Sequence, residues 1–316
     1  MKLFITLFAI TSSFTFIGCS LTNTQRVSSD PNDLSESRLG IIPEQERAVL
    51  PYQSKKKGIG TWGWRKSEKA MADLSQGASW YYTWWPHERG VKAPDTMEFV
   101  PMIYTREYAK DEYFEMAKQS PSGVLLGFNE PDRAAQANMS VEEALEHWPK
   151  FEETGLRLGS PAMADDETRP DSWMRRFLAG TDDYKPQVDF LCVHRYPHTR
   201  DPYEALNLLE EYLARVYRTF GLPIWLTEFS MIHFNVGPGG VALFPSDEEQ
   251  AEFARKASEL LESLPYVERY AWFVISPYRR EAGFEAANFN LYDENGDVTE
   301  VGLAYRDSGR VLPRSE

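Results

Sequence analysis

Residues 123–130, with the sequence GVLLGFNE, form a short, largely apolar segment that ends in an asparagine and a glutamate. An apolar run of this length is typical of a buried strand in a parallel sheet. Seven similar runs alternate with longer helical patterns, so that the eight predicted strands are residues 58–64, 78–85, 98–104, 123–130, 156–162, 188–196, 223–229 and 267–275. Eight βαβ repeats in about 250 residues predict an α/β fold of a single domain, the (β/α)8 TIM barrel.

Start and stop signals support the helices between these strands. Ser140 with Glu143, and Ser246 with Glu249, have the spacing of a capping box, in which each side chain accepts from a backbone N–H of the other residue. Apolar residues recur every three or four positions after residue 203, and a glycine and a proline just beyond residue 220 predict the end of that helix.

Composition restricts the class of ligand. The 316 residues carry a formal net charge of −14, with 48 acidic and 34 basic side chains, and the one short basic run is Lys55–Lys57. Nucleic acid is therefore not expected as a partner. Aromatic residues make up 14 % of the chain, which fits either a large aromatic core or a site for a neutral ligand with apolar and hydroxyl surfaces.

The N-terminal residues predict export. Residues 1–18 have the lysine and the apolar stretch of a signal peptide, and FIGCS resembles a bacterial lipoprotein signal, which predicts lipidation of Cys19. Ordinary signal-peptide cleavage is the alternative. Residues 19–54 are polar and predict a tether, followed by a folded domain at residues 55–310. We expect a lipid anchor at a bacterial outer membrane or cell surface, or else a periplasmic or secreted protein. Cys192, in an apolar run, is expected to be a free buried thiol.

Most acidic residues lie on polar faces of the predicted helices, but two glutamates do not. Glu130 ends the fourth predicted strand and Glu228 nearly ends the seventh. A partly buried carboxylate costs free energy unless it is paired, and in a barrel this end of the strands carries the catalytic groups. Two carboxyls about 5 to 5.5 Å apart suit a retaining glycosidase, and their repulsion raises the proton affinity of one of them. The alternative is that each pairs with an arginine at the barrel rim.

With these residues in place, the sequence resembles the retaining (β/α)8 glycosidases of clan A, through NEP in the fourth strand and TEF in the seventh. The segments SWYYTWWP, EFVPMIY, LLGFNEPD, LGSPA, VDFLCVHRY, PIWLTEF and VERYAWF together resemble glycoside hydrolase family 128, whose members act within β-1,3-glucan chains. The resemblance implies a glycoside hydrolase domain at residues 55–310.

The resemblance also implies roles for single residues. Glu130 would be the acid/base and Glu228 the nucleophile, in a double displacement that retains the anomeric configuration. Asn129 would bind the sugar 2-hydroxyl, while His194 and Tyr196 would orient the nucleophile and the sugar. Arg195 departs from the family pattern, which has an aromatic residue there, and would pair with Glu228, with another acid on the rim or with an acidic sugar substituent.

Six aromatic residues lie near the ends of predicted strands, where their rings could stack on sugars. They are Trp62, Trp64, Tyr82, Trp84, Tyr104 and Trp272. Each could instead belong to the core.

Other functions fit the sequence less well. His194 and His198 lie close together, but no HExxH helix and no GxSxG elbow occur, so we expect neither a metal nor another cofactor. Two alternatives stay open: a retaining hydrolase of another β-glycan (mixed-linkage, branched or acidic), and a non-catalytic carbohydrate-binding surface lipoprotein. The expected partner is a β-glucan polysaccharide or oligosaccharide, bound by a monomer.

Overall fold

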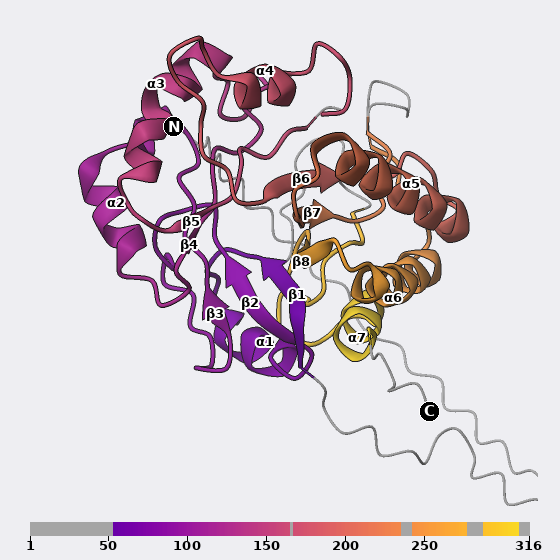
Figure 1. Ribbon diagram of the computed structural model, residues 1–316. Helices are drawn as coiled ribbons and strands as arrows, with labels where there is room; N and C mark the ends of the chain where they lie inside the picture. The colour runs from indigo at the N-terminus through magenta and orange to yellow at the C-terminus, as the bar shows by residue number, and fades with distance from the viewer. Residues whose placement is uncertain (1–52, 165–166, 235–241, 277–286, 310–316) are drawn as a thin grey trace, which may run out of the picture. The chain divides into compact units, whose positions relative to one another are not determined.

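The computed structural model describes residues 53–164, 167–234, 242–276 and 287–309 (Figure 1). The strands are β1 (Ser54–Gly60), β2 (Ala78–Tyr82), β3 (Glu98–Phe99), β4 (Val124–Leu125), β5 (Arg157–Leu158), β6 (Leu191–Arg195), β7 (Ile224–Phe229) and β8 (Val267–Trp272). The helices are α1 (Ser67–Leu74), η2 (Arg106–Tyr108), α2 (Asp111–Lys118), α3 (Val141–Glu152), α4 (Trp173–Ala179), α5 (Pro202–Phe220), α6 (Asp247–Ser263) and α7 (Glu300–Asp307).

The strands are arranged in a ring. Six of them pair in the order β3-β2-β1-β8-β7-β6, and β4 pairs with β5, all in parallel. Isolated parallel bridges join the two groups, from Met102 to Leu126 on one side and from Gly159 to Phe190 on the other. The order around the ring is therefore the order of the chain, with β8 beside β1, as in a (β/α)8 barrel. The predicted fold class is confirmed.

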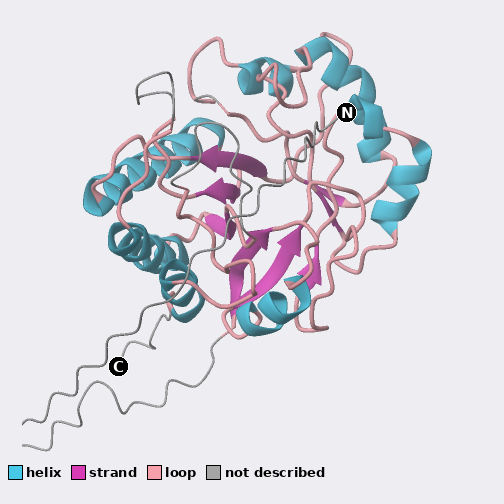
Figure 2. Cartoon of the chain, turned by 180° about the vertical axis from the view of Figure 1, so that it is seen from behind, coloured by secondary structure: helices cyan, strands magenta, loops and turns pink. Residues whose placement is uncertain are grey.

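Two layers of core follow from the alternation of side chains along each strand. One cluster fills the inside of the ring and consists of Trp80, Tyr82, Val100, Met102, Val124, Leu126, Ala162, Phe190, Cys192, Trp225 and Ala271. The intervening residues, such as Tyr81, Leu191 and Val193, belong to an outer cluster with the helices. Figure 2 shows the helices around the strands. Cys192 is a free, buried thiol, as expected.

The eight predicted strands all exist, although β3, β4 and β5 are only two residues long by their hydrogen bonds. The first one differs in position, because β1 begins at Ser54 and includes the basic run. Lys57 is fully buried there, and its Nζ donates to the backbone oxygens of Tyr305 and Ser308. A lysine that has buried carbonyl partners is compatible with a strand, which the sequence pattern did not reveal.

The predicted helix ends are confirmed. Both capping boxes are present, at the start of α3 and at the start of α6. Helix α5 ends at Phe220, and Gly221 follows in the left-handed conformation that glycine adopts most readily. These local signals hold because each depends on residues within one turn of the chain.

The predictions for the signal peptide, for lipidation of Cys19 and for nearly all of the tether fall on residues 1–52, outside the described residues.

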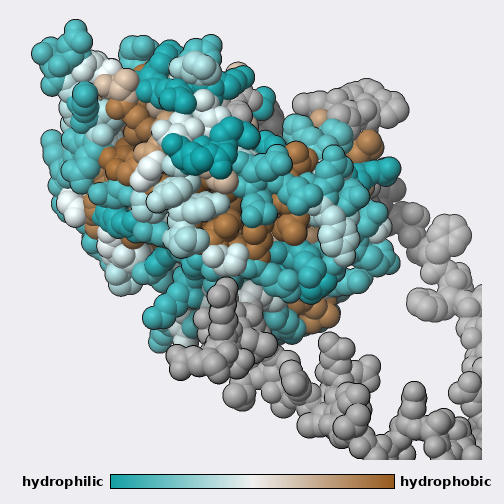
Figure 3. Space-filling view, turned by 45° about the vertical axis from the view of Figure 1, so that its right-hand side comes forward, coloured by the Kyte–Doolittle hydropathy of each residue, from teal (hydrophilic) through white to brown (hydrophobic). Residues whose placement is uncertain are grey.

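Within the described segments, no helix has both the length and the apolar character needed to cross a bilayer. The face in Figure 3 is mainly hydrophilic, with hydrophobic side chains in separate groups. Among the described residues, the exposed large hydrophobic side chains are spread over several parts of the chain: Met116, Tyr203, Tyr217, Leu243 and Leu303. The monomeric state stays a prediction.

Candidate active site

Three ionisable side chains meet at the carboxyl ends of the strands. The register of β6 and β7 places His194 beside Glu228, and Glu130 follows β4 with its backbone N–H donating to Ala162 at 2.7 Å. Nδ1 of His194 lies 2.9 Å from Oε1 of Glu130 and 3.5 Å from Oε2 of Glu228. One oxygen of each glutamate lies within 4.8 Å of the other. The structure therefore brings the two predicted carboxylates together, with an imidazole between them.

A break in the strand alternation turns Glu228 into the ring. Leu226 and Phe229 both belong to the outer cluster, although they are three residues apart, and the register of β7 against β8 shifts between them. A shift of this kind, as in a β-bulge, re-aims the side chains that follow it. Strict alternation would have placed Glu228 on the same side as Leu226, away from Glu130.

A similar break precedes Glu130. Leu126 lies in the inner cluster and Phe128 in the outer one, so the alternation changes at Gly127. A Cβ at Gly127 would lie 2.7 Å from the backbone nitrogen of Pro161, so only glycine allows the two chain segments to come this close. The close approach supports the segment that carries Glu130.

Hydrogen-bond donors surround the carboxylate of Glu228. Nε1 of Trp84 donates to Oε1 at 2.8 Å, and the hydroxyl of Tyr196 donates to Oε2 at 2.7 Å. The hydroxyl of Tyr82 is 3.5 Å from Oε1 but donates mainly to the backbone oxygen of Thr227, at 2.8 Å. Each oxygen of Glu228 thus has one short hydrogen bond, which fixes the plane of the carboxylate.

Burial dominates the acid–base properties of the site. It raises the pKa of Glu228, and the charge of Glu130 acts in the same direction, while protonated His194 and the bonds from Tyr196 and Trp84 limit the shift. Burial disfavours the charged form of His194, but Glu228 and Glu130 outweigh it and raise the pKa of this imidazole. The sequence led us to expect a raised pKa from carboxylate repulsion; the structure assigns it to Glu228, and burial is its larger cause.

Two residues of the site adopt left-handed backbone conformations. Glu130 has φ 45° and Trp84 has φ 57°, although neither is a glycine. A residue with a large side chain pays about 1 to 3 kcal/mol for this conformation, and such residues gather at functional sites. No local sequence signal predicts them.

Several predicted sugar-binding residues lie beside this cluster. The ring of Trp84 is 4.8 Å from that of Tyr82 and 6.0 Å from that of Trp62, between centroids. Asn129 is buried, its backbone N–H donates to the oxygen of Tyr104, and its Oδ1 has no hydrogen-bond partner in the described part of the chain. The hydroxyl of Tyr104 donates to Gln136 and also interacts with the Asn129 side chain.

The structure does not bring Trp272 to this cluster. Its ring is fully buried in the outer cluster, and its Nε1 donates to the backbone oxygen of Phe289, so it cannot stack on a ligand. The next residue, Phe273, lies at the mouth instead, with its ring 5.9 Å from Trp84 and 6.0 Å from Tyr196. Ala271 points into the ring, so alternation along β8 could have identified Phe273.

Arg195 and Trp64 also lie away from the carboxylates. In β6 the inner positions belong to Cys192 and His194, so Arg195 points outward, with its guanidinium 4.9 Å from the centre of the Tyr212 ring on α5. No ion pair between Arg195 and Glu228 is present in the described residues. Among the described residues, the ring of Trp64 makes no stacking contact with the cluster around Glu130 and Glu228. The buried Nε1 of Trp64 has no hydrogen-bond partner among those residues either.

Glu130, His194 and Glu228 are close enough to be ligands of one metal ion. However, each oxygen of Glu228 already accepts a hydrogen bond, and Nδ1 of His194 faces two carboxylates as a donor would. A metal ligand presents a lone pair rather than a proton, so this arrangement favours a proton between the three groups.

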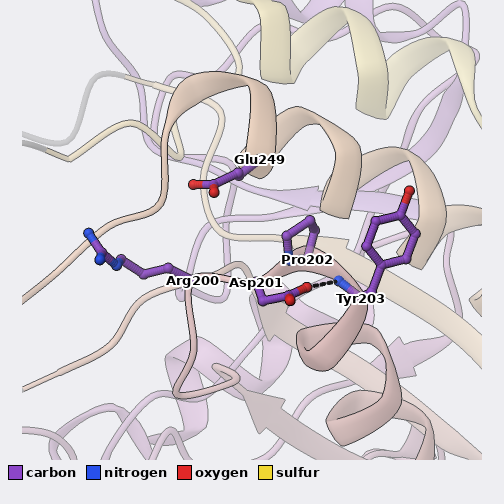
Figure 4. Close-up of a pocket in the computed structure, with 5 residues that line it drawn as sticks. All are labelled: Arg200, Asp201, Pro202, Tyr203 and Glu249. Atoms are coloured by element: carbon purple, nitrogen blue, oxygen red, sulfur yellow. Dashed lines mark hydrogen bonds between the residues drawn. The ribbon is translucent and has the colours of Figure 1, made fainter.

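A separate pocket lies at the start of α5 and α6 (Figure 4). It is lined by Arg200, Asp201, Pro202, Tyr203 and Glu249. The carboxylate of Asp201 accepts a hydrogen bond from the backbone N–H of Tyr203 and so caps helix α5. None of these residues belongs to the cluster around Glu130 and Glu228. The pocket is therefore not the candidate active site.

Comparisons with known proteins bear on the family of the chain. A family model described as the glycosyl hydrolase catalytic core matches residues 59–305. Alkali-sensitive linkage protein 1 of Schizosaccharomyces pombe is 27 % identical over 246 residues, 73 % of this chain. The matched region is 41 % of the yeast protein, so the chain spans less than half the length of this curated relative.

Solved structures narrow the family. A subgroup I endo-β-1,3-glucanase of family 128 from Amycolatopsis mediterranei, with laminarihexaose, is 37 % identical, with a TM-score of 0.73, over 81 % of this chain and 100 % of that one. Structures of that enzyme with either of two glutamates replaced hold laminari-oligosaccharides. A subgroup V exo-β-1,3-glucanase from Cryptococcus neoformans is 27 % identical, with a TM-score of 0.60, over 80 % of this chain and 99 % of that one.

The family model covers most of the chain, and the similarity to the Amycolatopsis enzyme extends over the whole of that enzyme. The eight-stranded ring and the pair of carboxylates at its mouth are what such an enzyme needs. The chain belongs to glycoside hydrolase family 128, and it is a glycoside hydrolase.

Proposed function

We propose that the protein hydrolyses β-1,3-glucan within the chain and with retention of anomeric configuration, with Glu130 as acid/base and Glu228 as nucleophile. The observation that carries the proposal is the distance of at most 4.8 Å between one oxygen of each glutamate. Retaining glycosidases hold their two carboxyls about 5 to 5.5 Å apart, whereas inverting ones need about 6.5 to 9.5 Å to admit a water molecule.

The reaction has two displacement steps. In the first, Glu228 attacks the anomeric carbon while Glu130 protonates the departing glycosidic oxygen, so that the sugar becomes an ester of Glu228. In the second, Glu130 takes a proton from water, and the water oxygen displaces Glu228 from the same face that the leaving group left. The two inversions together give net retention. His194 contacts both carboxylates and can hold their relative position as the charge moves between them.

The choice of β-1,3-glucan draws on the relatives. The Amycolatopsis enzyme binds laminari-oligosaccharides. The number of residues between its two replaced glutamates in the sequence is nearly the same as that between Glu130 and Glu228. Trp62, Trp84 and Phe273 provide aromatic faces near the carboxylates. The Oδ1 of Asn129 has no hydrogen-bond partner among the described residues and can accept from a sugar hydroxyl. The two relatives differ in mode of action, since the Amycolatopsis enzyme is an endo-glucanase and the Cryptococcus enzyme an exo-glucanase. We propose endo action because the Amycolatopsis enzyme is the more similar of the two.

The test is hydrolysis of linear β-1,3-glucan, mixed-linkage glucan, cellulose and xylan by the purified full-length protein. We expect activity on β-1,3-glucan, with products of mixed length and an initial β-anomer by NMR. Fastest hydrolysis of another glycan would favour the alternative substrate, and an initial α-anomer would reject retention. Binding without hydrolysis of any of the four would leave the carbohydrate-binding lipoprotein.

The location of the protein is a separate proposal. We infer that Cys19 carries a lipid after removal of residues 1–18, and that residues 19–54 tether the domain to a membrane or cell surface. The support is the FIGCS sequence and the polar composition that follows it. Incorporation of labelled palmitate into the wild type, and its loss in Cys19→Ser, is the expected result. Equal labelling of the two proteins would contradict lipidation at Cys19.

A further inference from the structure

The indole of Trp84 is directed edge-on at the carboxylate of Glu228. Its Nε1 lies 2.8 Å from Oε1, while aromatic rings adjoin the indole: Tyr82 at 4.8 Å, Phe273 at 5.9 Å and Trp62 at 6.0 Å between centroids. From its place near the end of a predicted strand, Trp84 was expected either to stack on a sugar or to belong to the core. Its best-defined contact, however, is with a charged group of the protein.

Glycine at position 60 makes room for this indole. A Cβ on Gly60 would lie 2.8 Å from Cη2 and 3.0 Å from Cζ2 of Trp84, closer than side chains tolerate. Gly60 is not among the residues with positive φ, so its backbone alone does not require glycine. The space is what requires it.

A neighbouring pair, Gly58 on β1 and Trp80 on β2, shows what is particular about Trp84, which follows the end of β2. Gly58 faces Trp80 in the same way, with a Cβ–Cε2 distance of 2.2 Å, but the indole of Trp80 donates to the backbone oxygen of Lys56. Trp80 is therefore part of the barrel core, whereas the N–H of Trp84 serves a catalytic carboxylate. The left-handed φ of 57° at Trp84 shows that the surroundings hold the residue in a conformation it would not adopt by itself.

We infer that Trp84 is a positioning residue, which fixes the nucleophile Glu228 through its indole N–H, and that Gly60 is the residue that allows it to do so. The inference rests on the proposed function, because it takes Glu228 as the nucleophile. An indole N–H neither gains nor loses a proton at working pH, so it is a constant donor to the ionised carboxylate. With Tyr196 on the other oxygen, it leaves Glu228 one orientation.

Trp84→Phe tests this, because phenylalanine keeps an aromatic face and loses the donor. We expect kcat on β-1,3-glucan to fall about ten- to a hundredfold, since a hydrogen bond to a charged group is lost, with KM within about twofold. The acid limb of the kcat/KM profile should move to higher pH, because a donor that favours ionised Glu228 is gone. Gly60→Ala should act in the same direction while the indole is still present.

Trp173→Phe is the matched control. Trp173 lies on helix α4, and its indole N–H donates to the backbone oxygen of Met139 rather than to a carboxylate. It should leave kcat and the pH profile unchanged. A higher KM in Trp84→Phe, with kcat and the profile of the wild type, would overturn the inference and make Trp84 a stacking surface. Unchanged kinetics in Gly60→Ala would remove Gly60 from the inference.

Glu228→Ala separates this inference from the proposed function. With an aryl β-laminaribioside and azide, azide should attack the anomeric carbon, release the aryl alcohol and give an α-glycosyl azide, because the nucleophile is missing. If no azide product forms, Glu228 is not the nucleophile, and both proposals fail. If it forms but Trp84→Phe behaves as the wild type, only the role of Trp84 fails.

Discussion

Glu130 and Glu228 differ in how firmly the protein holds them. Glu228 lies within the six-residue strand β7, its side chain is 8 % exposed, and each of its oxygens accepts a short hydrogen bond. Glu130 follows a two-residue strand, has a left-handed backbone and a 13 % exposed side chain, and contacts His194 through one oxygen. A nucleophile benefits from a fixed position, whereas an acid/base must exchange a proton with water and with the leaving group. The difference in surroundings matches the proposed difference in role.

The largest effects should come from removing each carboxylate. Glu228→Gln and Glu130→Gln should each lower kcat/KM on β-1,3-glucan by at least about a thousandfold. The two should separate on an aryl β-glucoside oligosaccharide with a good leaving group, since its departure needs no proton. Glu130→Gln should form the glycosyl-enzyme at a useful rate, seen as a burst of aryl alcohol, and Glu228→Gln should not.

Glu211→Gln is the control for this pair, because Glu211 is exposed on α5. It should have wild-type rates. Equal loss of the burst in both active-site variants would remove the distinction between the roles, and a wild-type rate in either would remove that glutamate from the mechanism.

The imidazole between the carboxylates should come next. His194→Ala removes a group that contacts both, and we expect a loss of about a hundredfold in kcat/KM. Protonated His194 lowers the pKa of Glu228, so its removal should move the acid limb of the profile to higher pH. Rates across pH 3 to 9 measure this. An acid limb that stays in place or moves to lower pH would show that protonated His194 does not lower the pKa of Glu228.

Loss of one donor to the nucleophile should have a smaller effect. Tyr196→Phe removes the 2.7 Å hydrogen bond to Oε2, which favours the ionised form of Glu228. We expect kcat to fall about tenfold, with the acid limb again moved to higher pH. Tyr184→Phe, which removes a hydroxyl bonded to Glu152 between α3 and the loop before β6, is the matched control. An acid limb at the wild-type position would mean that Tyr196 does not tune Glu228.

Chelation should have the smallest effect. If a proton rather than a metal ion lies between the two glutamates and His194, treatment with EDTA followed by dialysis should leave kcat/KM unchanged. Loss of activity, with recovery upon addition of one divalent cation, would show that these three residues are metal ligands.

The residues at the barrel mouth show how far sequence patterns reach. The inward positions of His194 and Tyr196, and the outward one of Arg195, follow from simple alternation in β6, and the same rule applied to β8 would have chosen Phe273 over Trp272. Alternation fails for Glu228, since a register shift in β7 turns it inward. A bulge has no dependable local signature, so its effect needed the assembled sheet.

The sequence by itself determined the order of eight strands, the ends of the main helices, and two glutamates at the ends of the fourth and seventh strands, because these depend on periodicity and on neighbours within a turn. Only the tertiary structure decided which groups surround each glutamate. Trp84 and Glu228 are 144 residues apart, and His194 and Glu130 are 64 apart. Contacts at such separations arise from ring closure and close backbone approach, which no local pattern encodes.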